Sequence, residues 1–105
     1  EGGMLQALGY AHCEEYAFND QGRMVNDSLG PYKIYRADEM PDFEVFLIQT
    51  MEDSGPFGAK AVAEIPKDGV APAIRNAILH ATGAVINEIP FTPERVWKKI
   101  GEIDN

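Results

Sequence analysis

The sequence has a single cysteine and no long apolar run, and each shortage excludes a class of protein. Cys13 stands alone among 105 residues, so an internal disulfide and a zinc site built from several cysteines are both excluded. No apolar stretch approaches the roughly 20 residues needed to cross a bilayer, and no signal-peptide pattern is present. We therefore expect a cytoplasmic protein with no membrane partner.

Basic residues are also scarce. Nine Lys and Arg stand against seventeen Asp and Glu, which gives a formal net charge of −8, and only Lys98 and Lys99 are adjacent. A basic patch supplies most of the affinity for nucleic acid or an anionic membrane surface. We expect neither partner, and the simplest role of the acidic surface is solubility.

The remaining composition is typical of a folded domain, with 45% hydrophobic and 25% charged residues. The length allows one domain at most, and a lone domain of this size buries roughly two-thirds of its unfolded surface. The sequence opens directly on Glu1-Gly2-Gly3-Met4. Such a beginning suggests a segment of a longer protein.

Apolar periodicity predicts three helices and a few short strands. The helices are expected at 3–13, at 70–82 with Gly83 as the stop, and from Pro93 onward with Thr92 as the N-cap. Strands are expected at 15–18 and 43–49, and short extended segments at 23–25, 32–35 and 84–87. The predicted class is α+β, helices packed on a few short strands. These strands look too isolated for a full sheet, so we expect them to pair with chain outside this sequence.

Residues 54–66, SGPFGAKAVAEIP, are the candidate site. Small side chains leave this backbone nearly bare, so its N–H groups could serve as donors to an anionic or polyoxo ligand. Glu64 stands between such residues with Val62 and Ile65 beside it, and partial desolvation there would suit it to base catalysis. Tight packing against another element would favour the same composition, so the residues alone leave both interpretations open.

The order of these residues closely resembles the active-site segment of molybdenum hydroxylases, the xanthine dehydrogenase/aldehyde oxidase family. Residues 1–9, EGGMLQALG, look like the glycine-rich helix start of that family. Further similarities follow in the family's order along the chain, at residues 32–34, 70–78, 81–83 and 90–96. The resemblance identifies residues 1–105 as a C-terminal segment of the molybdopterin-binding domain in the large subunit.

The resemblance implies a role for each residue of the candidate site. Glu64 would act as general base on a molybdenum-bound hydroxyl, in an enzyme that oxidises an aldehyde or an N-heterocycle with oxygen derived from water. The backbone near the cofactor would be that of Gly58, Ala59, Lys60, Ala61, Val62 and Ala63. The metal would belong to the molybdopterin cofactor, with no ligand from this chain. The partners would be the rest of the large subunit, iron–sulfur clusters and FAD on other domains or subunits, and a small-molecule substrate.

Four features depart from the family pattern. Ala63 stands where glycine is usual, Tyr35 replaces a proline, and residues 67–69 replace a more apolar stretch. The glutamine that helps to bind the pterin in relatives would precede residue 1. The resemblance therefore implies a fragment that is inactive alone. The alternative is a non-catalytic acidic module that keeps the family fold for assembly or interaction.

Other chemically notable residues are expected to serve packing or solvation. We expect packing roles for Gln6, His12, Cys13, His80, Phe91 and Trp97, with Phe91 and Trp97 as core anchors of the last helix. Arg75 and Arg95 are expected to be solvated helix charges.

Overall fold

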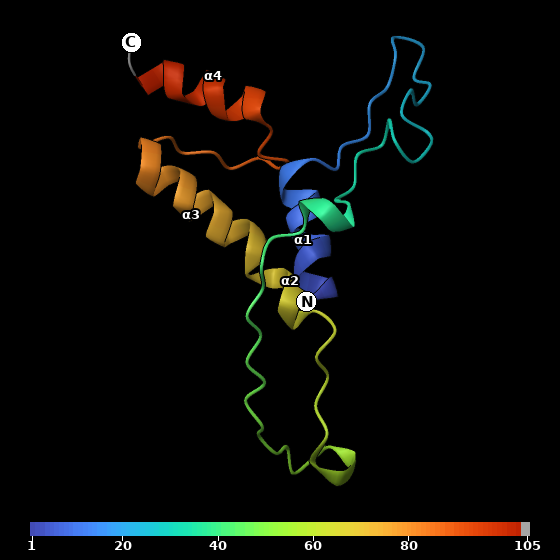
Figure 1. The fold of residues 1–105 in the computed structure, drawn as a ribbon, viewed down its shortest axis with the longest axis vertical. Coiled ribbons are helices and arrows are strands. Elements are labelled where there is room, and N and C mark those ends of the chain that lie inside the picture. Colours follow the sequence, from blue (N-terminus) through green and yellow to red (C-terminus); the bar gives the residue numbers. More distant parts are fainter. Residues whose placement is uncertain (104–105) are drawn as a thin grey trace.

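The computed structural model describes residues 1–103, which form four helices and long irregular segments (Figure 1). The helices are α1 (Gly2–His12), α2 (Ile65–Asp68), α3 (Val70–Thr82) and α4 (Pro93–Ile103). Two 3-10 turns, η1 (Ala37–Glu39) and η2 (Pro56–Gly58), lie between α1 and α2. Helix α1 contacts both α2 and α3, so residues far apart in the sequence form the centre of the structure. Within the described residues, no helix is long and apolar enough to cross a membrane.

The three helices predicted from the sequence are confirmed. Helix α3 ends where Gly83 adopts the left-handed conformation, with φ 77° and ψ −5°, and donates its N–H to the Leu79 carbonyl at 2.8 Å. Helix α4 starts at Pro93, and the hydroxyl of Thr92 accepts a hydrogen bond from the Arg95 N–H at 3.3 Å. The short helix α2 was not predicted from the sequence.

The expected short strands do not form a sheet, so the α+β prediction is not confirmed. Residues 1–103 contain only two isolated bridges, Phe18 with Met24 and Leu29 with Tyr32. The first bridge closes a turn in which Gly22 donates its N–H to the Asn19 carbonyl at 2.9 Å. Residues 43–49 and 84–87 have no strand assignment. A strand requires a neighbour for its backbone hydrogen bonds, and the described chain places none beside them.

The core is small and lies where α1, α3 and α4 meet the segment after α3. Ala11, Ile86 and Phe91 form its buried centre, and the Phe91 N–H donates to the Ala11 carbonyl at 2.6 Å. The prediction of Phe91 as an anchor is confirmed, whereas that of Trp97 is wrong, because Trp97 is 73% exposed. Val96 packs against the core, and the next residue lies about 100° further round the helix.

The molecule is much more extended than a compact domain of its length. Its radius of gyration is 17.7 Å, against about 13 Å for a compact domain of this size. Its accessible surface is 8331 Å², against about 5,800 Å² for a folded monomer of this mass. Residues 14–32 project from one side of the helices and residues 42–64 from another (Figure 1).

Candidate active-site segment

The candidate site lies on the segment that Figure 1 shows extending away from the helices, which we call the arm and define as residues 42–64. The arm leaves the helices after η1, turns at η2 and returns to α2. Residues 58–63 form the returning half, and Glu64 is the last residue before α2. All the residues of the predicted site therefore lie on one continuous stretch.

The tip of the arm is held by its own hydrogen bonds. Gly58 donates its N–H to the Gly55 carbonyl at 3.0 Å, and the Glu52 N–H donates to the Gly58 carbonyl at 3.3 Å. A Cβ at position 55 would lie 2.1 Å from the Ala59 carbonyl oxygen, so this turn requires glycine. Across the arm, the Lys60 ammonium donates to the Thr50 hydroxyl at 2.7 Å. This bond ties the predicted site to the outgoing half of the arm.

The N–H groups of residues 60–63 are free, whereas those of Gly58 and Ala59, which were also predicted to lie near the cofactor, donate to the carbonyls of Gly55 and Pro56 at 3.0 Å. The N–H groups of residues 60–63 form no hydrogen bond with any part of residues 1–103. Such a donor set suits the oxygen atoms of an anionic cofactor. Among the described non-glycine residues only Phe57 has a positive φ, of 56°. Ala63 therefore does not occupy the conformation that would demand glycine, and its methyl group is accommodated.

Glu64 is exposed, and its carboxylate has no hydrogen-bond or ion-pair partner within residues 1–103. Its backbone is fixed, because its carbonyl accepts the N–H groups of Lys67 at 2.8 Å and Asp68 at 3.2 Å. The desolvation expected from Val62 and Ile65 is absent, since both side chains are mostly exposed. The chain thus presents a free carboxylate from a fixed position without enclosing it.

The position of Glu64 depends on close packing between α2 and α1. A Cβ at Gly3 would lie 2.7 Å from Cγ of Pro66, so the absence of a side chain permits this approach. On the next turns of α1, the Tyr10 hydroxyl donates to the Lys67 carbonyl at 3.0 Å. These two contacts fix α2, and with it the residue that precedes it.

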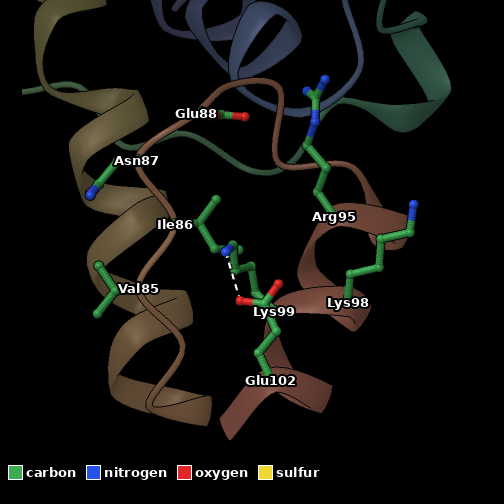
Figure 2. A pocket seen from close by; sticks show the side chains of 8 residues that line it. All are labelled: Val85, Ile86, Asn87, Glu88, Arg95, Lys98, Lys99 and Glu102. Atoms are coloured by element: carbon green, nitrogen blue, oxygen red, sulfur yellow. Dashed lines mark hydrogen bonds and ion pairs between the residues drawn. The ribbon is translucent and has the colours of Figure 1, made fainter.

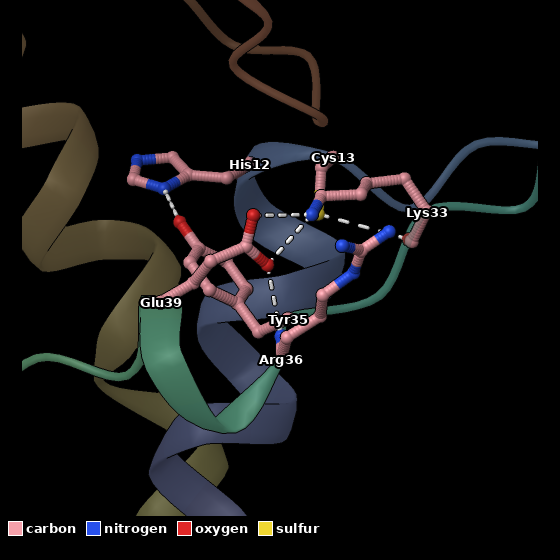
Figure 3. Close-up of polar contacts among 6 residues, drawn as sticks. All are labelled: His12, Cys13, Lys33, Tyr35, Arg36 and Glu39. Atoms are coloured by element: carbon pink, nitrogen blue, oxygen red, sulfur yellow. Dashed lines mark hydrogen bonds and ion pairs between the residues drawn. The ribbon is translucent and has the colours of Figure 1, made fainter. Parts of the chain in front are cut away.

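A polar cluster at the end of α1 holds the chain that leads into the arm (Figure 3). His12 Nδ1 and the Tyr35 hydroxyl share a hydrogen bond at 2.6 Å. The Lys33 ammonium donates to both carboxylate oxygens of Glu39, at 2.5 and 2.6 Å, and Glu39 also accepts the Arg36 N–H at 2.9 Å. Sequence reasoning missed this cluster, because its residues are spread over a stretch that is rich in turn formers.

The surroundings of the cluster change the proton affinities of its members. Burial lowers the pKa of His12, so the ring favours its neutral form. Burial also raises the pKa values of Cys13 and Tyr35. The hydrogen bond from Lys33 lowers the pKa of Glu39, which keeps that carboxylate ionised. Packing roles for His12 and Cys13 agree with their partial burial, although Cys13 is not fully buried.

A cavity of about 370 Å³ lies between α4 and the segment after α3 (Figure 2). Three cations line it, but each has a carboxylate partner: Arg95 pairs with Glu15, Lys98 with Glu94 and Lys99 with Glu102. Arg95 also donates to the Pro90 carbonyl at 2.9 Å, so the prediction of a merely solvated charge is wrong for this residue. With its cations neutralised, the cavity is not suited to binding an anion.

Metal-binding side chains do not gather in the described part of the chain, where no group of three or more His, Cys, Asp or Glu residues could hold an ion. A molybdenum cofactor would therefore meet this chain through backbone donors and through Glu64. Both are available on the arm, so the residues present are compatible with such a group beside them.

Comparison with known proteins finds molybdenum-binding proteins similar to this chain. Residues 1–41 match the model of a molybdopterin cofactor-binding domain. The chain is 35% identical over 103 residues to the probable hypoxanthine oxidase XdhD of Escherichia coli K12, covering 97% of this chain and 11% of that protein. It is also 35% identical over 99 residues to the putative xanthine dehydrogenase molybdenum-binding subunit XdhA of the same organism, covering 93% of this chain and 13% of that subunit.

A solved structure has the same fold over nearly the whole chain. Quinoline 2-oxidoreductase from Pseudomonas putida 86 superimposes with a TM-score of 0.84 at 31% sequence identity, over 96% of this chain and 13% of that one. The chain thus spans only about an eighth of the length of the proteins it matches.

Proposed function

We propose that this chain, which belongs to the xanthine dehydrogenase/aldehyde oxidase family of molybdenum hydroxylases as a segment of the molybdopterin-binding subunit, supplies the general base of the hydroxylation site. The base is Glu64. The observation that carries this proposal is that the Glu64 backbone is fixed on α2 while its carboxylate has no partner within residues 1–103. A carboxylate held in place but free of ion pairs can accept a proton from a group brought beside it.

The cofactor, when bound, would supply the redox chemistry, and the oxygen that is transferred would come from water. The chain supplies position and proton transfer. The free N–H groups of residues 60–63 would face the cofactor or substrate, and the bond between Lys60 and Thr50 would keep this backbone in place. Enclosure by the rest of the subunit would then desolvate the carboxylate, which strengthens it as a base.

The whole enzyme is inferred to hydroxylate a small electron-poor molecule. Similar proteins are named for hypoxanthine and quinoline, which are aromatic N-heterocycles, and one at the same 35% identity is named for aldehydes, so the proposed substrate is an N-heterocycle or an aldehyde. Electrons would leave through iron–sulfur clusters and FAD on other domains or subunits. Residues 1–105 would complete their α+β architecture with the rest of the large subunit and would be inactive alone.

Replacing Glu64 tests the proposal in the full-length enzyme. We expect Glu64→Gln to leave molybdenum content unchanged and to lower kcat by roughly 10²- to 10⁴-fold, because the amide cannot accept the proton. Asp68→Asn is the matched control, since Asp68 is an exposed carboxylate one helical turn further along. Near-normal turnover of both variants would reject the role of Glu64 and favour the non-catalytic assembly module.

A further inference from the structure

Tyr10 joins the core of the protein to the short helix that follows Glu64. Its ring packs against the buried centre of the core, and its hydroxyl donates to the Lys67 carbonyl of α2 at 3.0 Å. We infer that Tyr10 is a positioning residue for the hydroxylation, which sets the place of the Glu64 carboxylate through α2 without touching the reacting atoms. The inference deepens the proposed function and rests on it.

Helix α2 is too short to hold its own shape. It has only four residues, and a single turn fixes several backbone dihedrals in return for very few hydrogen bonds, so it is unstable by itself. Its N-cap residue, Glu64, forms no side-chain capping bond. The turn therefore depends on contacts from outside α2.

Those contacts come from one side of α1, which lies beside α2 (Figure 1). Gly3 and Tyr10 are seven residues apart, which is about two helical turns, so they lie on the same side of α1. Gly3 only leaves room for the ring of Pro66, whereas Tyr10 forms a directed bond. Within residues 1–103, no other side-chain hydrogen bond reaches α2.

The bond from Tyr10 continues through one peptide group to Glu64. The peptide between Lys67 and Asp68 accepts the Tyr10 hydroxyl at its oxygen and donates its N–H to the Glu64 carbonyl at 3.2 Å. Hydrogen bonds in such a chain polarise and strengthen one another. The Lys67 N–H donates to the same carbonyl at 2.8 Å. Since the Glu64 carboxylate has no partner within residues 1–103, these backbone bonds hold the residue in place.

The place of this carboxylate matters because a general base acts only within hydrogen-bond reach of the proton that it accepts. A misplacement of about 1 Å far from the chemistry can lower a rate roughly 100-fold. Release of a single helical turn from the core permits displacements of that size. The Tyr10 hydroxyl therefore affects the rate of proton transfer rather than the binding of substrate.

Kinetics of the full-length enzyme test this role, with hypoxanthine, quinoline and benzaldehyde as trial substrates. Tyr10→Phe removes the hydroxyl and keeps the ring on the core. We expect it to leave molybdenum content unchanged and to lower kcat about 10- to 100-fold, with KM within about threefold of the unmodified value. Unchanged kcat in Tyr10→Phe, with Glu64→Gln impaired, would overturn the inference alone.

Tyr32→Phe is the matched control. It also removes a tyrosine hydroxyl that forms a hydrogen bond, here to the Glu14 carboxylate at 2.9 Å, but on the segment that projects away from α2 (Figure 1). Its kcat should equal that of the unmodified enzyme. An equal loss of kcat in Tyr32→Phe and Tyr10→Phe would indicate general loosening of the fold and overturn the positioning role.

A double variant separates an effect through Glu64 from an effect elsewhere. When Glu64→Gln is already present, adding Tyr10→Phe should lower kcat by less than about twofold, because no base remains to be misplaced. A further loss as large as that of Tyr10→Phe alone would show that Tyr10 acts independently of Glu64, and the inference would be wrong. Near-normal turnover of Glu64→Gln itself would reject the proposed function, and the inference with it.

Hydrogen exchange of the full-length subunit provides a readout that needs no turnover. The amides of Lys67 and Asp68, which hold the Glu64 carbonyl, should exchange about five- to tenfold faster in Tyr10→Phe than in the unmodified subunit, since one hydrogen bond to the turn is lost. The control Tyr32→Phe should leave both rates unchanged. Equal rates in Tyr10→Phe and the unmodified subunit would mean that the hydroxyl does not hold α2, which would overturn the inference.

Discussion

His12 shares a hydrogen bond with Tyr35 in the polar cluster that leads into the arm, and its charge state depends on pH. Burial lowers its pKa from the ordinary value of 6.5, so the unfolded chain binds this proton more tightly than the folded chain. Stability from neutral His12 is therefore fully present above pH 6.5 and is lost as the pH falls through the lower folded pKa. An NMR titration of the His12 ring should give a midpoint below that of the same chain in urea. A midpoint equal to or above the urea value would contradict this.

Single residues could be predicted from the sequence where a local rule applies. Gly83 and Thr92 follow from the conformation and the hydrogen bond that a helix end requires. The bond between His12 and Tyr35 could not be predicted, because it joins residues 23 positions apart across irregular chain. Trp97 was mistaken for an anchor because size and apolarity say nothing about which side of α4 faces the core.

Contact between α1 and α2 is the element-level feature on which the position of Glu64 depends. Gly3→Ala would place a methyl group 2.7 Å from the ring of Pro66, and relief of that overlap should lower the free energy of unfolding by about 1–3 kcal/mol. Gly2→Ala is the matched control, because nothing lies within 4 Å of a Cβ at that position. Urea titration of the two variants in the full-length subunit checks the difference. Equal stability would mean that α2 can move away from α1 freely.

Helices were predictable because each carries its own hydrogen bonds and end signals. Strands were predicted from extended apolar segments, but the described residues contain no neighbouring strand to pair with them. The path of residues 43–49 shows the difference: the segment is extended as expected and still forms no strand within the described residues. In the candidate site, small side chains indicated an open backbone over residues 58–63, but neither the turn that occupies the N–H groups of Gly58 and Ala59 nor the lack of enclosure around Glu64 could be predicted.

The whole molecule buries little surface for its length. Its accessible surface corresponds to burial of about half the unfolded surface, where a compact domain buries roughly two-thirds. We expect the isolated chain to unfold in urea with a broad transition and a slope below about 1 kcal/mol per molar. Far-UV circular dichroism during a urea titration measures that slope. A sharp transition with the slope of a compact domain would show that the isolated chain is more compact than this structure.

The meeting of α1 with α2 closes a loop of more than fifty residues that includes the whole arm. The entropy lost on closing a flexible loop grows only with the logarithm of its length, so halving this loop would gain only about 0.6 kcal/mol. Selection for stability would therefore exert little pressure on the length of the arm. A long arm is therefore compatible with a firm contact between α1 and α2, which holds Glu64 in place however far the chain travels in between.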